Sequence, residues 1–265
     1  DGSMKRVHVD LFSGIGGFAL AARWNGIKTV QFVEKDRQCR AVLQKNFPGV
    51  PIHDDITTFK WAGERPFMVA GGDPCPCRSR AKSIWGSACP DLSGYFLAVV
   101  AGCRPRWVVR ENVPASDDSH FCAALEAIGY RSVIVSTNAI AFTAQNRRRD
   151  FIVAADDPDR IRSFSGSPVF TSDIRIAEPI CATAPACFCL TTRRQRYDYR
   201  DNYVWEGGRL RVLDSEERRR LSGYPDGWTT GLSKTTVARM YGNTIVPQVA
   251  SEIIRAILMV EEADQ

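Results

Sequence analysis

Short apolar runs alternate with longer amphipathic stretches from Val7 to about Ala155. Apolar runs of this length are typical of buried strands, and the stretches between them have the spacing of helices. The alternation predicts an α/β fold in which helices flank a mostly parallel sheet. The expected strands are Val7–Leu11, Thr29–Val33, Phe67–Ala70, Trp107–Glu111, Tyr130–Asn138 and Phe151–Ala155, and the expected helices are Phe18–Asn25, Arg37–Asn46, Asp91–Cys103 and Ser119–Ile128.

This pattern stops after Asp156, where Pro, Ser, Thr and Cys interleave with arginines as far as about Trp205. We therefore expect a first domain over residues 4–155, a small second lobe over 156–205 and a return segment over 206–265. Residues 1–3 precede Met4 and look like an expression scar, so they are left out of this division. The end of the return segment has an apolar stripe at helical spacing, which should pack against the first domain: Val249, Ile253, Ile254, Ile257 and Leu258.

A glycine-rich turn follows the first expected strand. Gly14 and Gly16 allow a tight turn and let a ligand approach the backbone at the start of the next helix. Glu34 ends the second strand, where a carboxylate can accept hydrogen bonds from ribose hydroxyls. Asp55 and Ile56 offer an acidic and an apolar side chain that can hold an adenine by its amino group and its face. On spacing alone, NAD and S-adenosylmethionine both fit this half of the chain, and a glycine turn without a ligand is the alternative.

A cysteine turn follows the third expected strand. Gly72 and Pro74 end that strand, and Cys75 comes at the carboxyl edge of the expected sheet, where open α/β sheets bind their ligands. A single cysteine is more often a small core residue. Glu111 reaches the same edge, however, and a thiol and a carboxyl group brought together favour a catalytic site.

Three polar residues at alternate positions, Gln145, Arg147 and Arg149, precede the last expected strand. Alternate residues of an extended segment face the same way, so these side chains should point together. Such a face is either solvated or binds a ligand.

The composition limits the class of protein. The chain has 265 residues, 44% of them hydrophobic, which is enough for one large domain with a smaller lobe. It contains no run of about 18 apolar residues and no charged-then-apolar leader, so we expect a cytoplasmic protein without a membrane span. Nine irregularly spaced cysteines favour reduced thiols. The pairs Cys75-Pro76-Cys77 and Cys187-Phe188-Cys189 lack the usual spacing of zinc ligands, so no metal is expected.

The net charge is only +5, but arginines cluster between residues 193 and 220. A run of like charges is usually a solvated face, and the more specific alternative is that these arginines contact phosphate groups. The cluster comprises Arg193, Arg194, Arg196, Arg200, Arg209, Arg211, Arg218, Arg219 and Arg220.

These motifs, in this order, resemble those of the DNA (cytosine-5) methyltransferase family. The resemblance covers nearly the whole chain except about residues 156–205, where that family carries its variable target-recognition segment. It implies a Rossmann-like S-adenosylmethionine-dependent methyltransferase fold with a small, irregular target-recognition lobe. The matching segments are Asp10–Gly17, Glu34, Asp55–Thr57, Pro74-Cys75, Glu111–Val113, Gln145 with Arg147 and Arg149, Arg211 to Glu217, Arg220-Leu221, Gly223–Pro225, Gly242-Asn243 and Val246-Pro247.

The resemblance also implies roles for single residues. Cys75 is the nucleophile that attacks carbon 6 of a flipped-out cytosine, and Glu111 holds ring nitrogen 3 in its protonated form. Arg149, supported by Arg147 and Gln145, binds the ring carbonyl. Carbon 5 then takes the methyl group of S-adenosylmethionine, which leaves as S-adenosylhomocysteine. The implied cofactor-binding residues are Phe12, Gly14, Ile15, Gly16, Gly17, Glu34, Asp55, Ile56, Pro74 and Asn243.

The resemblance implies that the partner is double-stranded DNA and that the protein is a monomer. It also implies a bacterial or phage origin and a cognate restriction endonuclease. The expected contacts with the nucleic acid are Arg78, Ser79, Arg80, Lys82, Arg193, Arg194 and Arg196. The sequence departs from the family after Cys75, where Pro76-Cys77-Arg78-Ser79 replaces the usual Gln-Pro-Phe-Ser, and the variable lobe is short. The alternatives are a tRNA cytosine-5 methyltransferase, a catalytically silent DNA-binding relative and an NAD oxidoreductase.

Overall fold

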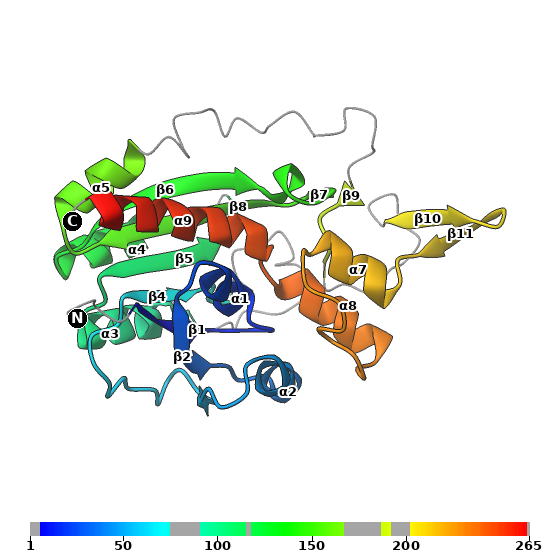
Figure 1. Cartoon of the computed structure of the whole chain (residues 1–265), viewed down its shortest axis with the longest axis horizontal. Helices are drawn as coiled ribbons and strands as arrows, with labels where there is room; N and C mark the ends of the chain where they lie inside the picture. Colours follow the sequence, from blue (N-terminus) through cyan, green and yellow to red (C-terminus); the bar gives the residue numbers. More distant parts are fainter. Residues whose placement is uncertain (1–5, 75–90, 115–117, 167–186, 192–201, 264–265) are drawn as a thin grey trace.

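The helices and strands follow one another in the α/β order that the hydrophobic pattern predicts (Figure 1). The computed structural model describes residues 6–74, 91–114, 118–166, 187–191 and 202–263. Every strand and helix expected between Val7 and Ala155 is present, with ends within three residues of the predicted ones. The elements are β1 (Val7–Leu11), α1 (Gly17–Trp24), β2 (Lys28–Val33), α2 (Arg37–Asn46), β3 (Ile52–His53), β4 (Met68–Gly71), α3 (Ser93–Cys103), β5 (Trp107–Asn112), α4 (Ser119–Ala127), β6 (Arg131–Asn138), β7 (Gln145–Asn146), β8 (Arg148–Ala155), α5 (Pro158–Ser165), β9 (Cys187–Phe188), β10 (Tyr203–Glu206), β11 (Arg209–Val212), α7 (Ser215–Leu221), α8 (Lys234–Asn243) and α9 (Pro247–Ala263).

A seven-stranded sheet with the order β3-β2-β1-β4-β5-β8-β6 forms the centre of the fold. Neighbouring strands from β3 to β5 are parallel, whereas β8 is antiparallel to both β5 and β6. The predicted mostly parallel sheet is confirmed. The position of β8 between β5 and β6 was not predicted, because an apolar run does not reveal the direction or the neighbours of its strand.

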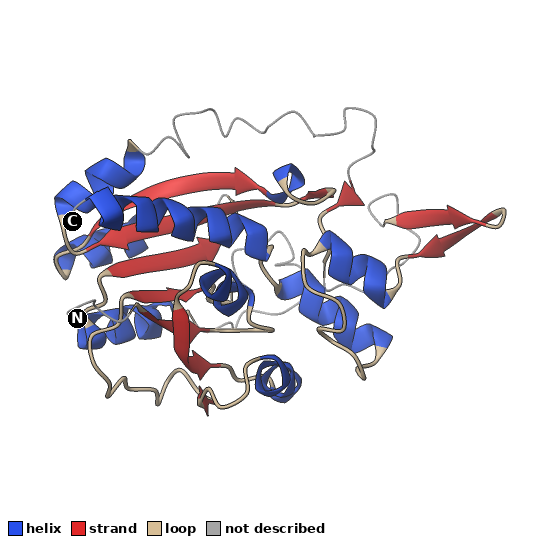
Figure 2. Ribbon diagram, in the orientation of Figure 1, coloured by secondary structure: helices blue, strands red, loops and turns tan. Residues whose placement is uncertain are grey.

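Helices cover both faces of the sheet (Figure 2). On one face, α1, α5 and α9 pack over Met68, Ala70 and Val109. On the other, α3 and α4 pack over Val69 and Val108. Alternate residues of β4 and β5 therefore enter different cores, as the two-residue period of a strand requires. Burial on both faces explains why these strands read as continuous apolar runs.

The terminal helix α9 packs back on the first domain, as its apolar stripe predicts. Val249, Ile253, Ile254 and Ile257 are at most 5% exposed and share a core with residues of α1 and α5. The stretch Lys234–Ala263 is long and apolar enough to cross a membrane by composition. A helical break at residues 244–246 divides it into α8 and α9, and most of its apolar residues are buried inside the protein, although Met259 is 42% exposed.

The chain from residue 156 onward contributes both to the sheet domain and to a separate region beside it. Residues 158–165, within the range expected for the second lobe, form α5, which Asp157 caps by accepting a hydrogen bond from the amide of Asp159. Ile161 and Phe164 of α5 belong to the same core as α9. The hairpin of β10 and β11 projects from the opposite end of the molecule, next to α7 (Figure 1).

We expect His8 to make folding sensitive to acid. Its ring is fully buried on β1, with Nδ1 3.0 Å from Thr29 Oγ1, and burial lowers the pKa of His8 to about 3. In the unfolded chain the pKa is about 6.5, so the unfolded state binds the extra proton first as the pH falls. The free energy of unfolding should therefore drop below pH 6.5, by up to about 1.4 kcal/mol per pH unit from this residue.

Urea unfolding at pH 7.5, 6.5, 5.5 and 5.0 measures this effect. His8→Gln should flatten the slope between pH 6.5 and 5.0. His120→Gln, at an exposed position of α4, is the control. Its free energy of unfolding should depend on pH in the same way as that of the unsubstituted protein. An unaltered slope in His8→Gln would show that other groups cause the acid sensitivity.

Candidate active site

The carboxyl ends of the parallel strands meet at one edge of the sheet. In the strand register, Leu11 lies opposite both Val33 and Gly71, Val33 lies opposite His53, and Gly71 lies opposite Arg110. The segments that follow these positions carry most of the residues singled out in the sequence. The sheet thus brings together groups that are up to about a hundred residues apart in the chain.

The glycine turn after β1 is built around Glu34. Gly14 N–H donates to Glu34 Oε2 at 2.6 Å, and Asp36 N–H donates to Oε1 at 2.7 Å. Burial raises the pKa of the half-buried Glu34 carboxyl, and the two backbone hydrogen bonds oppose this shift. Gly14 has a φ of +53°, with open space where a Cβ would lie. The turn is therefore preformed, and it leaves room for a ligand next to a carboxylate.

Gly16 and Gly17 are required for close packing at the start of α1. Gly16 has a φ of +86°, and a Cβ there would lie 2.8 Å from the ring of Phe47. A Cβ on Gly17 would lie 2.6 Å from Ile245 and 2.7 Å from the hydroxyl of Tyr224. Ile15 is buried, and its carbonyl accepts a hydrogen bond from Trp228 Nε1 at 2.9 Å. Gly17 and Ile15 thus join the turn to the return segment, and Gly16 packs it against the end of α2.

Phe12 has an unusual backbone conformation for a bulky residue. Its φ of +52° lies in the left-handed region, and its half-buried ring stacks on Phe96 of α3 with the ring centroids 6.4 Å apart. Strained backbone of this kind is concentrated at functional sites. Phe12 thus presents a partly open aromatic face beside the glycine turn.

Asp55 and Ile56 follow β3 at the same edge. Asp55 Oδ1 accepts hydrogen bonds from the amide and hydroxyl of Thr57 at 2.9 and 2.8 Å, and these bonds lower the pKa of Asp55. Oδ2 accepts none from the described residues. Ile56 is 7% exposed and lies in the core that Phe12 borders.

Glu111 forms a close ion pair with Arg149. The distance from Arg149 Nε to Glu111 Oε1 is 2.6 Å, and both side chains are about 15% exposed. The backbone of the cysteine turn passes directly beside this pair, since a Cβ on Gly72 would lie 2.9 Å from Glu111 Oε2. A carboxylate, a guanidinium and the start of the cysteine turn therefore occupy one place.

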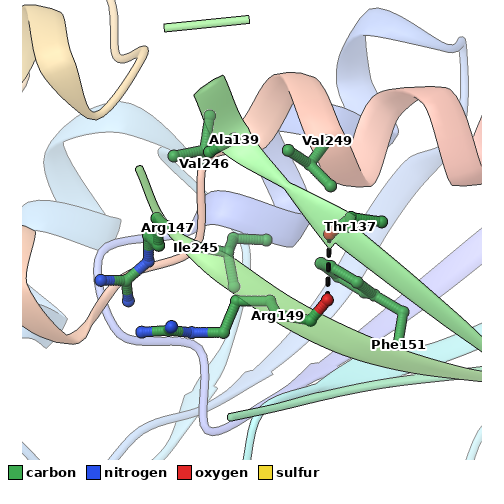
Figure 3. Close-up of a pocket in the computed structure, with 8 residues that line it drawn as sticks. All are labelled: Thr137, Ala139, Arg147, Arg149, Phe151, Ile245, Val246 and Val249. Atoms are coloured by element: carbon green, nitrogen blue, oxygen red, sulfur yellow. Dashed lines mark hydrogen bonds between the residues drawn. The ribbon is translucent and has the colours of Figure 1, made fainter. Parts of the chain in front are cut away.

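A pocket of about 200 Å³ borders this pair. Arg147 and Arg149 line it together with apolar residues that include Phe151, Ile245 and Val246. Figure 3 shows the two guanidinium groups on the same side of the strand.

Arg147 and Gln145 hold separate parts of the chain together. The Arg147 guanidinium is buried and donates to the carbonyls of Thr244 (2.6 Å), Gly242 (3.3 Å) and Leu190 (3.2 Å), and it lies 3.2 Å from Cys189 Sγ. Gln145 Nε2 donates to the carbonyl of Leu221, and its Oε1 accepts from the amide of Leu190. Arg147 and Arg149 share the pocket, whereas Gln145 is committed to these backbone contacts.

The remaining site residues divide into two groups. Asn243 is exposed at the end of α8, and Pro74 is exposed two residues after Gly72. The other group lies outside the described residues and comprises Cys75, Arg78, Ser79, Arg80, Lys82, Arg193, Arg194 and Arg196.

Several of the clustered arginines form ion pairs within the protein instead of a basic face. Arg211 is paired with Glu206 and Glu217, and the buried Arg219 is paired with Glu216 and Asp226. Arg218 is also buried. Their acidic partners are near neighbours in the chain, a pairing that a count of like charges does not take into account.

Sequence reasoning missed a buried cluster of charges beside the cysteine turn. Arg110 of β5 is 1% exposed and binds Asp73 and Asp118. The sequence feature that could have revealed this cluster is a charged residue directly after the apolar run of β5. The network of Tyr224 and Thr244, whose hydroxyls are hydrogen-bonded, was also missed.

Comparison with known families gives a match over most of the chain. The model of the family described as C-5 cytosine-specific DNA methylase matches residues 7–178 and 188–259. The match includes every described site residue.

Among characterised proteins, the chain is 35% identical over 168 residues to type II methyltransferase M2.BsuMI of Bacillus subtilis, covering 57% of this chain and 42% of that protein. It is 23% identical over 295 residues to type II methyltransferase M.HindV of Haemophilus influenzae, covering 96% of this chain and 97% of that one. The chain thus spans less than half of the first relative and nearly all of the second.

Among solved structures, a variant of Spodoptera frugiperda DNMT2 superposes with a TM-score of 0.70 at 15% identity, over 96% of this chain and 99% of that one. This likeness confirms the Rossmann-like methyltransferase fold.

Glu34 should control cofactor affinity. In Glu34→Gln an amide nitrogen replaces one oxygen, so the side chain can no longer accept from both Gly14 and Asp36. Gln also lacks the charged acceptor that the ribose hydroxyls of a bound cofactor would use. Because a hydrogen bond to a charged group contributes about 1.5–3 kcal/mol, we expect S-adenosylmethionine to bind at least about tenfold more weakly. Because the Glu34 pKa is raised, affinity in the native chain should also fall as the pH is lowered through that pKa. Calorimetric titration from pH 8 to 5 tests both effects, with the exposed Glu64→Gln as the control. Equal affinity and pH dependence in Glu34→Gln would contradict this role.

Proposed function

This chain belongs to the C-5 cytosine-specific DNA methylase family, and we propose that it transfers a methyl group from S-adenosylmethionine to carbon 5 of a cytosine in double-stranded DNA. The observation that carries the proposal is the Glu111–Arg149 pair beside Gly72, at the point where the chain enters the Cys75 turn. An acidic group and a fixed cation next to a cysteine are the groups that a nucleophilic attack on a pyrimidine ring requires.

In the proposed reaction, the Cys75 thiolate forms a bond with carbon 6 of the cytosine. Glu111 holds a proton at ring nitrogen 3, which accepts the electron density that the attack pushes into the ring. Arg149 donates to the ring carbonyl. Positioned acid–base groups contribute about two to four powers of ten in rate. Carbon 5, made electron-rich by this addition, then takes the methyl group. Loss of the carbon 5 proton to a base lets the C–H electron pair reform the double bond between carbons 5 and 6 and expel the Cys75 sulfur as a thiolate.

The residues at the edge of the sheet fit S-adenosylmethionine, which supplies the electrophilic methyl group when bound. A carboxylate has about four acceptor sites, and the two Glu34 oxygens already accept one backbone N–H each, so acceptor sites remain for ribose hydroxyls. Phe12 offers a ring face, and Asp55 with Ile56 offers an acceptor next to an apolar contact. Gly14, Gly16 and Gly17 keep the turn short and open, and Asn243 completes the pocket.

The side chains of the Glu111–Arg149 pair are about 85% buried, so a base stacked in a duplex could not reach them. We infer that the target cytosine leaves the helix, at a cost of a few kcal/mol. Contacts with phosphate would come from the loop after Cys75 and from the arginines at 193, 194 and 196. A cognate restriction endonuclease and a bacterial or phage origin belong to this proposal, as does a monomeric state.

The first test is the covalent adduct. DNA with 5-fluorocytosine traps the bond, because fluorine at carbon 5 cannot leave as a proton does. Wild-type protein with S-adenosylmethionine should give an adduct that resists denaturing electrophoresis. Cys75→Ser should give none and transfer no methyl group, whereas Cys77→Ser, two residues away, should retain the adduct. An adduct that persists in Cys75→Ser and disappears in Cys77→Ser would show that Cys77, and not Cys75, is the nucleophile.

The second test identifies the nucleic acid. Duplex DNA of mixed sequence and total tRNA are each incubated with the protein and S-adenosylmethionine, and bisulfite sequencing then finds the methylated cytosines. We expect modification of DNA at a fixed sequence context and none of tRNA, with Cys75→Ser as the background for both. Modification confined to tRNA would replace the DNA proposal by the tRNA alternative.

A further inference from the structure

The cysteine turn is attached to the sheet through a buried guanidinium group. Arg110 Nε and Nη2 donate to the two carboxylate oxygens of Asp73 at 2.5 and 2.9 Å, and Nη1 donates to Asp118 Oδ1 at 2.9 Å. The side chains of Arg110, Asp73 and Asp118 are 1%, 6% and 3% exposed. Asn112 Nδ2 also donates to Asp118 Oδ1 at 2.9 Å.

Such a cluster is not what packing of the sheet requires. Three other residues of β5, Trp107 to Val109, are apolar and fully buried, and its remaining buried residue, Asn112, belongs to the same polar cluster. Burying an ion pair usually stabilises a fold no more than apolar residues of similar volume would, because both charges lose their water. Burial disfavours the charged guanidinium, but hydrogen bonds and charges from Asp73 and Asp118 raise the pKa of Arg110. The Arg110 guanidinium also lies 4.2 Å from the ring centroid of Phe121. The guanidinium is therefore bonded to two buried carboxyl groups and packed against an aromatic ring.

The cluster joins the two segments that carry the proposed chemistry. Asp73 lies two residues before Cys75, and Arg110 lies one residue before Glu111. Between Asp73 and Cys75 is Pro74, which has no N–H with which to anchor the turn. Gly72 brings the same turn so close to Glu111 that a Cβ would lie 2.9 Å from Oε2. The Asp73 side chain thus links the cysteine turn directly to β5, the strand that carries Glu111.

We propose that Asp73 and Arg110 are positioning residues that fix the Cys75 turn relative to Glu111 during attack on the base. This inference rests on the proposed function. The two parallel hydrogen bonds resist both sliding and rotation of the turn, which a single bond would not. A displacement of about 1 Å in a reacting group can lower the rate about a hundredfold. The pair touches neither base nor cofactor in this assignment, so its loss should change the rate of attack more than substrate affinity.

Asp118 provides the matched control. It binds the same guanidinium and is as deeply buried, but it belongs to the start of α4 and not to the cysteine turn. Asp73→Asn and Asp118→Asn each remove one negative charge from the cluster and keep the side-chain volume. A purely structural cluster would respond to both changes alike, whereas a positioning pair would respond mainly to the first.

The experiment measures melting temperature, kcat, KM for DNA and for S-adenosylmethionine, and the rate of adduct formation with 5-fluorocytosine DNA. In Asp73→Asn we expect kcat and the adduct rate to fall at least about tenfold, with both KM values within about threefold of wild type. Asp118→Asn should lower the melting temperature about as much as Asp73→Asn does, but it should keep kcat within about threefold of wild type.

Arg110→Lys is the second variant, because it keeps the charge but cannot form the bidentate contact. It should lower kcat as Asp73→Asn does, and the double variant should be no slower than the slower single one. A folded Asp73→Asn variant with wild-type kcat would overturn the positioning role of Asp73 and Arg110 but not the proposed function. An equal loss of kcat in Asp118→Asn would do the same. A wild-type chain that transfers no methyl group would overturn the proposed function and the pair with it.

Discussion

The register of the parallel strands is the constraint on which the site depends. Once Leu11 lies opposite Val33 and Gly71, and Gly71 lies opposite Arg110, the segments after β1, β2, β4 and β5 must end at one edge. A shift of one residue between two strands would turn the side chains of the shifted strand to the other face, and a shift between β4 and β5 would separate Glu111 from the cysteine turn. Helices on both faces oppose such a shift, because β4, β5 and β8 each contribute residues to two apolar cores.

Two ion pairs near this edge connect different segments of the chain. Arg149 binds Glu111 across neighbouring strands, and Arg110 binds Asp73 across β5 and the end of β4. In a partly dry interior these contacts are stronger than at the surface, and they leave few alternative arrangements. The proposed reaction moves charge into a base and out again. A site whose own charges are already fixed can accommodate this change with little reorganisation.

The return segment completes the site from the far end of the chain. Arg147 binds the carbonyls of Gly242 and Thr244, and Trp228 binds the carbonyl of Ile15 in the glycine turn. The C-terminal helix α9 then packs against α1, which starts from that turn. The turn near Phe12 and the pocket near Arg149 are therefore held by the same segment, although they lie at opposite ends of the first domain in sequence.

The sequence by itself determined the α/β order, the strand ends and the glycine turn, because hydrophobic period and glycine placement are local properties. It also indicated that Cys75 and Glu111 reach one edge, since parallel strands align their carboxyl ends. Only the tertiary structure decided the antiparallel position of β8, the ion pairs that remove Arg211 and Arg219 from any phosphate-binding face, and the Asp73–Arg110 contact. Those features depend on which distant segments become neighbours, and no local pattern records that choice.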